Sequence, residues 1–135
     1  VGNVPPGVKE SKKPWLKLTG PLGRSELTEV YLRSSLMIHP AKYDPFPSVI
    51  LEAANFEIPC AASTVCAIPE MIRDGVTGLL AEPSDEAGFA EKVAALLLDR
   101  TRLMAMGRAA KTDVRERFHP KAVAGRSGSV IGGCL

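Results

Sequence analysis

The sequence predicts an α/β fold, a doubly wound parallel sheet of about four strands with flanking helices. Short apolar runs alternate along the chain with stretches of helical periodicity, which is the pattern of repeated β-α units. The predicted strands are short, and the helices between them are expected to cover both faces of the sheet. A length of 135 residues fits one domain with a proper core.

The composition is that of a globular protein and excludes several classes of function. Apolar residues make up 45% of the chain and charged residues 24%. A net charge of only +2 gives no electrostatic footprint for nucleic acid. The longest clean apolar run, residues 93–98, is too short to span a bilayer. A longer parent protein could still associate with a membrane, but the sequence of this chain encodes no such association.

The cysteines argue against a metal site. Cys60, Cys66 and Cys134 lack paired metal-ligand spacing, and only His39 and His119 could join them. The odd number predicts reduced thiols and a cytoplasmic protein. The chain begins at Val1 without a basic and then apolar leader, so we expect it to be a piece of a longer protein.

The first half of the chain contains two predicted β-α units. Residues 16–19 form an apolar strand candidate, and Ser25 can cap the helix that follows. Residues 36–39 are the next strand. The loop 41–47 contains two prolines, and a helix is predicted over residues 48–56 because proline is tolerated at a helix start.

The second half continues the alternation. Residues 59–63 and 77–81 are predicted strands, separated by a short helix that Pro69-Glu70 opens. Ser84 or Asp85 then caps a long amphipathic helix, which residues 99–101 interrupt before a second helix over residues 102–118. We expect residues 1–124 to be a partial domain and the Gly- and Ser-rich residues 125–135 to be a flexible tail.

Doubly wound sheets bind ligands at the carboxyl ends of their strands, which directs attention to the loops 20–24, 40–48 and 64–69. The segment 44–52 reads DPFPSVILE. It places Asp44 in the loop and Glu52 in the second turn of the predicted helix, about 6 Å along the axis from Ser48. The N–H groups of Ser48 and Val49 at the helix start could hold a phosphate between the two acids.

This segment resembles the C-terminal domain of family 4 glycosyltransferases, retaining enzymes of the GT-B fold. That family has two acids separated by seven residues, with Phe and then Pro or Gly after the first acid and Glu-Ala at the second. The resemblance covers about residues 16–124 in order and spacing. The matching residues are Asp44, Phe46, Pro47, Glu52 and Ala53, then Pro59, Ile68-Pro69-Glu70 and the segment from Asp74 to Leu80, with Gly20, Glu26-Leu27 and Tyr31 upstream.

The resemblance implies roles for individual residues. Glu52 would accept hydrogen bonds from the ribose hydroxyls of a nucleotide, and Asp44 would lie beside the donor sugar and its reacting bond. The loop around Leu22 would lie near the base. The stretch that would contact sugar and pyrophosphate, mainly through its backbone, is Phe46, Pro47, Ser48 and Val49. His39 is expected to be packed or hydrogen-bonded, with a role near the donor sugar as the alternative.

The sequence departs from the family pattern at three places. Asp44 replaces the commoner Glu and shortens the side chain by a methylene. Glu57 stands where the family usually has a Gly in a left-handed helix cap. Cys66-Ala67 replaces a Gly-Gly pair, and these side chains are expected to crowd the donor phosphates.

The resemblance therefore implies a fragment of a glycosyltransferase that takes a UDP-, GDP- or ADP-sugar without a metal or other cofactor. The resemblance also implies that this chain lacks the acceptor-binding N-terminal domain and the Arg and Lys that the family places in earlier β-α units, so the isolated chain is expected to be inactive. The alternative is a diverged, non-catalytic module that binds a nucleotide or packs against a partner. A free-standing nucleotide-binding signalling domain is disfavoured, because no acidic cluster follows a first strand.

Overall fold

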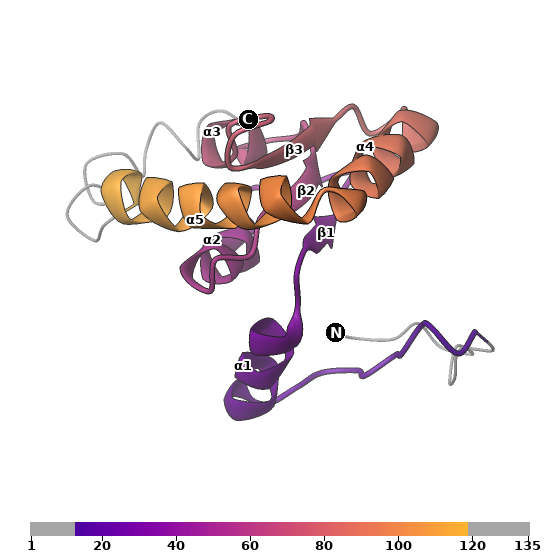
Figure 1. Cartoon of the computed structure of the whole chain (residues 1–135), viewed down its shortest axis with the longest axis vertical. Helices are drawn as coiled ribbons and strands as arrows, with labels where there is room; N and C mark the ends of the chain where they lie inside the picture. Colours follow the sequence, from indigo (N-terminus) through magenta and orange to yellow (C-terminus); the bar gives the residue numbers. More distant parts are fainter. Residues whose placement is uncertain (1–12, 119–135) are drawn as a thin grey trace. The chain divides into compact units, whose positions relative to one another are not determined.

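The computed structural model describes residues 13–118, and these fall into two compact units that meet between Arg33 and Ser34. The first unit contains helix α1 (Arg24–Arg33), which begins one residue before the predicted cap (Figure 1). Residues 16–19 form no strand, so that expectation is wrong. A strand needs a partner for its backbone hydrogen bonds, and within the described residues this segment has none.

The second unit holds the α/β core (Figure 1). Its elements in chain order are β1 (Met37–His39), α2 (Ser48–Asn55), β2 (Cys60–Ser63), α3 (Ile68–Met71), β3 (Gly78–Ala81), α4 (Glu86–Leu98) and α5 (Arg100–Arg117). Each agrees in type with the sequence prediction. Residues 125–135, predicted to be a flexible tail, lie outside the described residues.

The three strands form a parallel sheet in the order β1-β2-β3. Met37 pairs with Cys60, and Cys60 pairs with Gly78. The described residues thus contain three strands instead of about four, because the first predicted strand does not form. A side chain at position 78 would place its Cβ 2.3 Å from the carbonyl oxygen of Cys60, so this register needs a glycine there.

Helices cover both faces of the sheet, as predicted for a doubly wound fold. All four residues of β2 are buried, and their side chains alternate between two apolar clusters. One cluster joins β2 to α2 and α3 through Cys60, Ala62, Ile50, Ile68 and Met71. The other joins β2 and β3 to α4 and α5 through Ala61, Leu79, Leu96, Leu103 and Met106.

Helix α5 passes from one face of the sheet to the other. It begins against β2 and β3, and its later turns pack on α2 through Ala54, Ala110 and Val114. The crossing point is Gly107, which lies against Glu57 and Pro59 directly before β2. The chain therefore crosses the edge of the sheet where the strands begin, and it leaves the opposite edge, where they end, to the loops.

Asp99 separates α4 from α5, and Figure 1 shows the two helices meeting at an angle. Its carboxylate accepts a hydrogen bond from Arg102 N at 3.1 Å, and Asp85 caps α4 in the same way through Gly88 N at 3.0 Å. Asp85 is therefore the cap, and α5 begins two residues before its predicted start. In residues 13–118 no helix has the length and apolar character needed to cross a membrane.

Two cysteines lie within the described residues. Cys60 is a free thiol buried in the core. Cys66 is disulfide-bonded, so the expectation of reduced thiols is wrong for this residue. The prediction was wrong because an odd number of cysteines still allows one disulfide bond.

Burial raises the pKa of the Cys60 thiol from its ordinary value of 9.0 to about 12. Above pH 9 the unfolded chain loses a proton that the folded chain keeps, so the free energy of unfolding falls as pH rises towards 12. We expect Cys60→Ala to remove about 1 kcal/mol of the stability loss between pH 8 and pH 10. Urea unfolding of both proteins at the two pH values measures this, and an equal loss in both would contradict it.

Candidate functional site

The carboxyl ends of the three strands meet at one edge of the sheet because the strands are parallel. The loop after β1, residues 40–47, and the loop after β2, residues 64–67, lie along this edge. These are two of the three loops selected from the sequence. The third contains Leu22 and belongs to the first unit, so the proximity of Leu22 to a nucleotide stays a prediction.

Asp44 is held by the last residue of β1. Its Oδ2 lies 3.1 Å from Nε2 of His39, in a contact where the two side chains keep about a quarter to a third of their surface exposed. When Nε2 carries a proton, the ring donates it to the carboxylate. The prediction that His39 is hydrogen-bonded at a strand end is confirmed, and the bond ties the loop carboxylate to the rigid sheet.

Helix α2 begins directly after Pro47, as predicted from the sequence. Pro47 is buried and supplies no side-chain cap to the helix. Ile50 N donates to the Pro47 carbonyl at 3.0 Å, whereas the N–H groups of Ser48 and Val49 precede the first intrahelical bond. Both of these residues are exposed, so the helix presents two backbone donors at this edge of the sheet.

Phe46 and Glu52 face different surroundings. The Phe46 ring packs against the core cluster below the loop, which leaves its backbone as the part that can reach a ligand. Glu52 is exposed in the second turn of α2, next to the fully buried Ala53. The structure thus places Asp44 and Glu52 on either side of one helix start. That both carboxylates contact the same ligand stays a prediction.

Two of the three departures from the family pattern fall on strained backbone. Glu57 has φ 60° and Cys66 has φ 51°, and both values lie in the left-handed region. The left-handed cap expected at Glu57 is confirmed. An L-residue with a Cβ costs about 1–2 kcal/mol in this conformation, so each position would tolerate glycine better.

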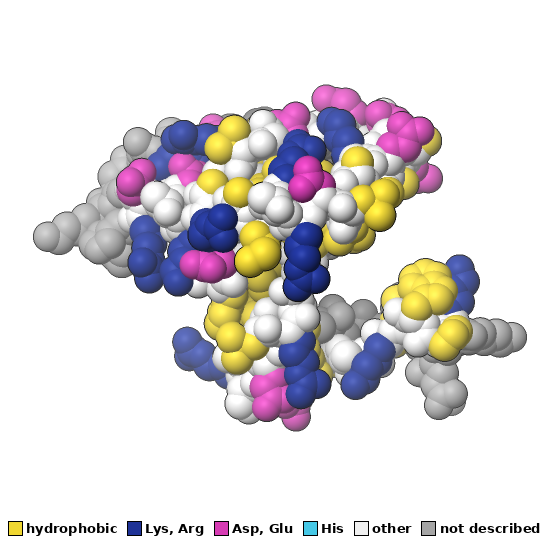
Figure 2. Space-filling view, viewed as in Figure 1, with side chains coloured by type: hydrophobic (Ala, Val, Ile, Leu, Met, Phe, Trp, Pro, Cys, Tyr) yellow, Lys and Arg dark blue, Asp and Glu magenta, His cyan; other side chains and the backbone are white. Residues whose placement is uncertain are grey.

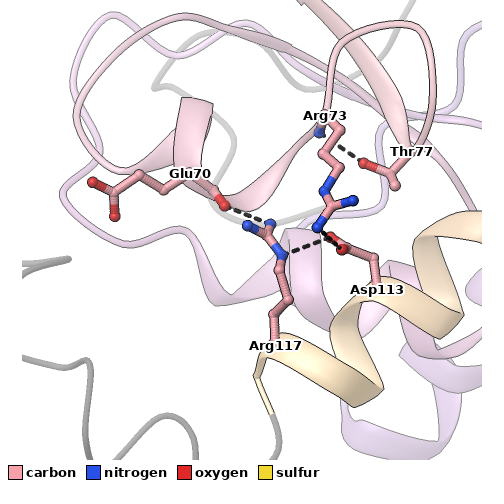
Figure 3. A network of polar contacts seen from close by, with 5 residues as sticks. All are labelled: Glu70, Arg73, Thr77, Asp113 and Arg117. Carbon is pink, nitrogen blue, oxygen red and sulfur yellow. Dashed lines mark hydrogen bonds and ion pairs between the residues drawn. The ribbon is translucent and has the colours of Figure 1, made fainter.

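A charged network links the end of α5 to α3 and to the turn before β3 (Figure 3). The buried Asp113 carboxylate binds Arg73 Nη2 at 3.2 Å and Arg117 Nε at 3.0 Å. Arg117 also donates to the Glu70 carbonyl, and the Arg73 backbone N–H donates to Thr77 Oγ1. Figure 3 shows the Glu70 carboxylate directed away from these contacts. The network therefore anchors the backbone of α3 and leaves the Glu70 side chain outside it.

Sequence reasoning missed this network. The spacing of Asp113 and Arg117 by four residues on one helix was a visible signal. No local pattern joins them to Arg73, which lies forty residues upstream of Asp113.

A parallel sheet with a proline-led helix start at its carboxyl edge defines a Rossmann-like half-domain, and comparison with solved structures agrees. Sucrose-phosphate synthase from Thermosynechococcus elongatus superposes with a TM-score of 0.73 and 26% identity, over 83% of this chain and 28% of that one. Anabaena Alr3699/HepE, solved with UDP-glucose, shares the fold with a TM-score of 0.67 and 21% identity, over 81% of this chain and 30% of that one.

The model of the family described as glycosyl transferases group 1 matches residues 10–113, and the chain belongs to this family. N-acetyl-alpha-D-glucosaminyl L-malate synthase of Bacillus anthracis is 34% identical over 76% of this chain and 27% of its own length. Glycogen synthase of Mycobacterium tuberculosis is 32% identical over 80% of this chain and 26% of its own length. The chain thus spans about a quarter of the length of these curated relatives.

Proposed function

We propose that this chain is the second half of the C-terminal, donor-binding domain of a family 4 glycosyltransferase with the GT-B fold. The parent would transfer a sugar from a nucleotide diphosphate to an acceptor with retention of configuration. One observation carries the proposal: α2 begins at the carboxyl edge of a parallel sheet, between Asp44 and Glu52, in a chain that matches the family over residues 10–113.

Each side chain around the helix start has a role that suits its chemistry. The exposed Glu52 carboxylate accepts hydrogen bonds from two neighbouring ribose hydroxyls. Asp44, oriented by His39, contacts the donor sugar near the reacting bond. The shorter Asp side chain keeps the charge of the usual Glu, and the bond to His39 fixes its direction.

The backbone at the start of α2 stabilises the leaving group. As the bond to the sugar breaks, negative charge grows on the nucleoside diphosphate. The N–H groups of Ser48 and Val49, together with the positive end of the helix dipole, favour that charge. Donors fixed in a folded helix need no reorganisation during the reaction. No metal is required for this role.

The remaining parts of the enzyme would lie in residues that this chain lacks. The chain spans about a quarter of the length of these relatives, and we expect the diphosphate-binding Arg and Lys and the acceptor-binding N-terminal domain in other parts of the parent. We therefore propose that the isolated chain binds nucleotides weakly and transfers no sugar. We propose a cytoplasmic location for the parent protein and leave open whether the parent contacts a membrane.

The second candidate is a diverged, non-catalytic module that binds a nucleotide or a protein partner. The strained backbone at Cys66, in the loop after β2, favours it, because a side chain there opposes close approach of donor phosphates. The two acids, Asp44 and Glu52, and the exposed residues at the start of α2 favour the enzyme.

UDP, GDP and ADP are the probes that distinguish donor bases.

Calorimetric titration of the chain with these diphosphates tests the proposal. We expect weak binding of one of them, and Glu52→Ala should reduce it about tenfold to a hundredfold because a charge-assisted hydrogen bond contributes about 1.5–3 kcal/mol. Glu91→Ala, which replaces another exposed glutamate in α4, serves as the matched control and should leave the affinity unchanged. Equal affinity of the Glu52→Ala variant and the unchanged chain would refute the ribose role.

A further inference from the structure

A second hollow lies at the other edge of the sheet, where the strands begin. Its volume is about 330 Å³, and it is bounded by α5, the end of α2 and the segment before β1. Its lining includes Phe56, Glu57, Leu97, Arg100, Met104 and Arg108. Ser35 precedes β1 and Glu57 precedes β2, so the hollow is separate from the carboxyl edge that carries the candidate donor site.

The hollow carries an excess of positive charge. Arg100 and Arg108 are both exposed, and within residues 13–118 no ion pair joins either of them. Glu57 is the single acid in the lining, and its Oε1 lies 3.9 Å from Lys111 Nζ. The ion pair of Glu57 is with Lys111 and with neither arginine. Two guanidinium groups are therefore left without a counter-charge.

The two arginines stand on the same side of α5. Arg100, Met104 and Arg108 follow one another at four-residue spacing, which keeps them within about 80° of arc and about 12 Å of axis. Side chains of this length can converge from both ends on a group held over Met104. Figure 2, in the view of Figure 1, shows Lys and Arg side chains flanking hydrophobic ones on the side where α5 lies in front.

The floor between the arginines is apolar. Leu97 is 51% exposed and Met104 is 53% exposed, although both belong to helices that bury other side chains in the core. Phe56 closes the side formed by the end of α2. A volume of this size is sufficient for a small organic ligand. The lining thus combines two planar cations with an exposed apolar surface.

We propose that this hollow binds a phosphate monoester whose organic part rests on Leu97 and Met104. A phosphate monoester carries close to two negative charges at neutral pH, which matches the two uncompensated guanidinium groups. Arginine also presents paired N–H groups that fit phosphate oxygens bidentately. This ligand site is additional to the donor site, and it shares no lining residue with Asp44, Glu52 or the start of α2.

Two kinds of ligand carry a phosphate monoester. One is a soluble phosphate ester, and the other is the headgroup of phosphatidic acid in a membrane. The experiment titrates the ¹⁵N-labelled chain with glycerol 3-phosphate, and separately measures co-sedimentation with phosphatidylcholine vesicles with and without phosphatidic acid. Both are done at physiological ionic strength, so that loose surface attraction is screened. Amide shifts over Arg100–Arg108 with the soluble ester identify a free ligand. Sedimentation that requires phosphatidic acid identifies a membrane headgroup.

Two double variants decide the proposal. Arg100→Gln with Arg108→Gln should weaken binding at least tenfold in whichever arm responds, because both phosphate contacts are lost. Arg102→Gln with Arg115→Gln removes the same charge from the same helix outside the hollow and should change affinity less than twofold. Equal weakening by both pairs, or no binding of either probe, would overturn the proposal. Nucleoside diphosphate titration of the first pair should match the unchanged chain, so this test is independent of the donor site.

Discussion

Replacing Gly107 with alanine is expected to destabilise the second unit by at least about 3 kcal/mol. A Cβ at this position would lie 2.0 Å from the carbonyl oxygen of Glu57 and 2.9 Å from its carbonyl carbon. These are backbone atoms, so no side-chain rotation relieves the overlap. Helix α5 would have to move away from α2 and open the cluster that Ala110 forms with Ala54. Urea unfolding followed by circular dichroism measures the loss.

Gly88→Ala is the matched control for this substitution. Its Cβ would meet only the side chain of Asp85, which can swing away at the cost of the cap on α4. The gain in helix propensity and the loss of the cap are each about 1 kcal/mol, so the net change is expected to be close to zero. Similar midpoints for Gly107→Ala and Gly88→Ala would contradict the packing described at the crossing of α5 and α2.

Asp113→Asn is expected to have the second large effect, a loss of about 3 kcal/mol of stability. The carboxylate is 8% exposed and bonds two guanidinium groups, of which that of Arg117 is partly buried at 21% exposure. An amide keeps the shape but removes the charge, so the Arg117 guanidinium loses its carboxylate partner and keeps its bond to the Glu70 carbonyl. Arg73 is 58% exposed and can return to water, which limits the loss to the lower part of the range for buried pairs.

Loss of the Asp113 network should also speed amide hydrogen exchange locally. Arg117 donates to the Glu70 carbonyl, so the Asp113→Asn variant should exchange amide hydrogens faster in α3 and in the turn up to Thr77. Glu116→Gln, an exposed neighbour on α5, is the control and should alter neither stability nor exchange. Unchanged exchange in α3 of Asp113→Asn would show that the network does not hold this helix.

The type of each element in the second unit could be predicted from the sequence because local pattern determines it. Proline at position 47 and the acidic caps mark helix starts, and the run of small apolar residues in β2 marks a strand buried on both faces. The strand predicted at residues 16–19 was wrong for a physical reason. An apolar run specifies a strand only if another strand pairs with it, and pairing cannot be read from the run itself.

The candidate site was predictable to the same extent. The start of α2 between two acids follows from residues that are close together in sequence. The sequence also predicts a packed or hydrogen-bonded His39, but it does not name Asp44 as the partner. The Asp113 network and the hollow beside Arg100 and Arg108 were not predictable. Their residues come from segments that only the folded chain brings together, such as the end of α2 and the first turns of α5.

The central claim is that a nucleoside diphosphate binds at the start of α2, and backbone amide shifts test it most directly. A titration of the ¹⁵N-labelled chain with UDP, GDP and ADP should move the amide signals of Ser48 and Val49 most, together with those near Glu52. Signals from Arg100 to Arg108 should stay in place. If saturating diphosphate leaves Ser48 and Val49 unmoved while other regions respond, the donor site has been assigned to the wrong edge of the sheet.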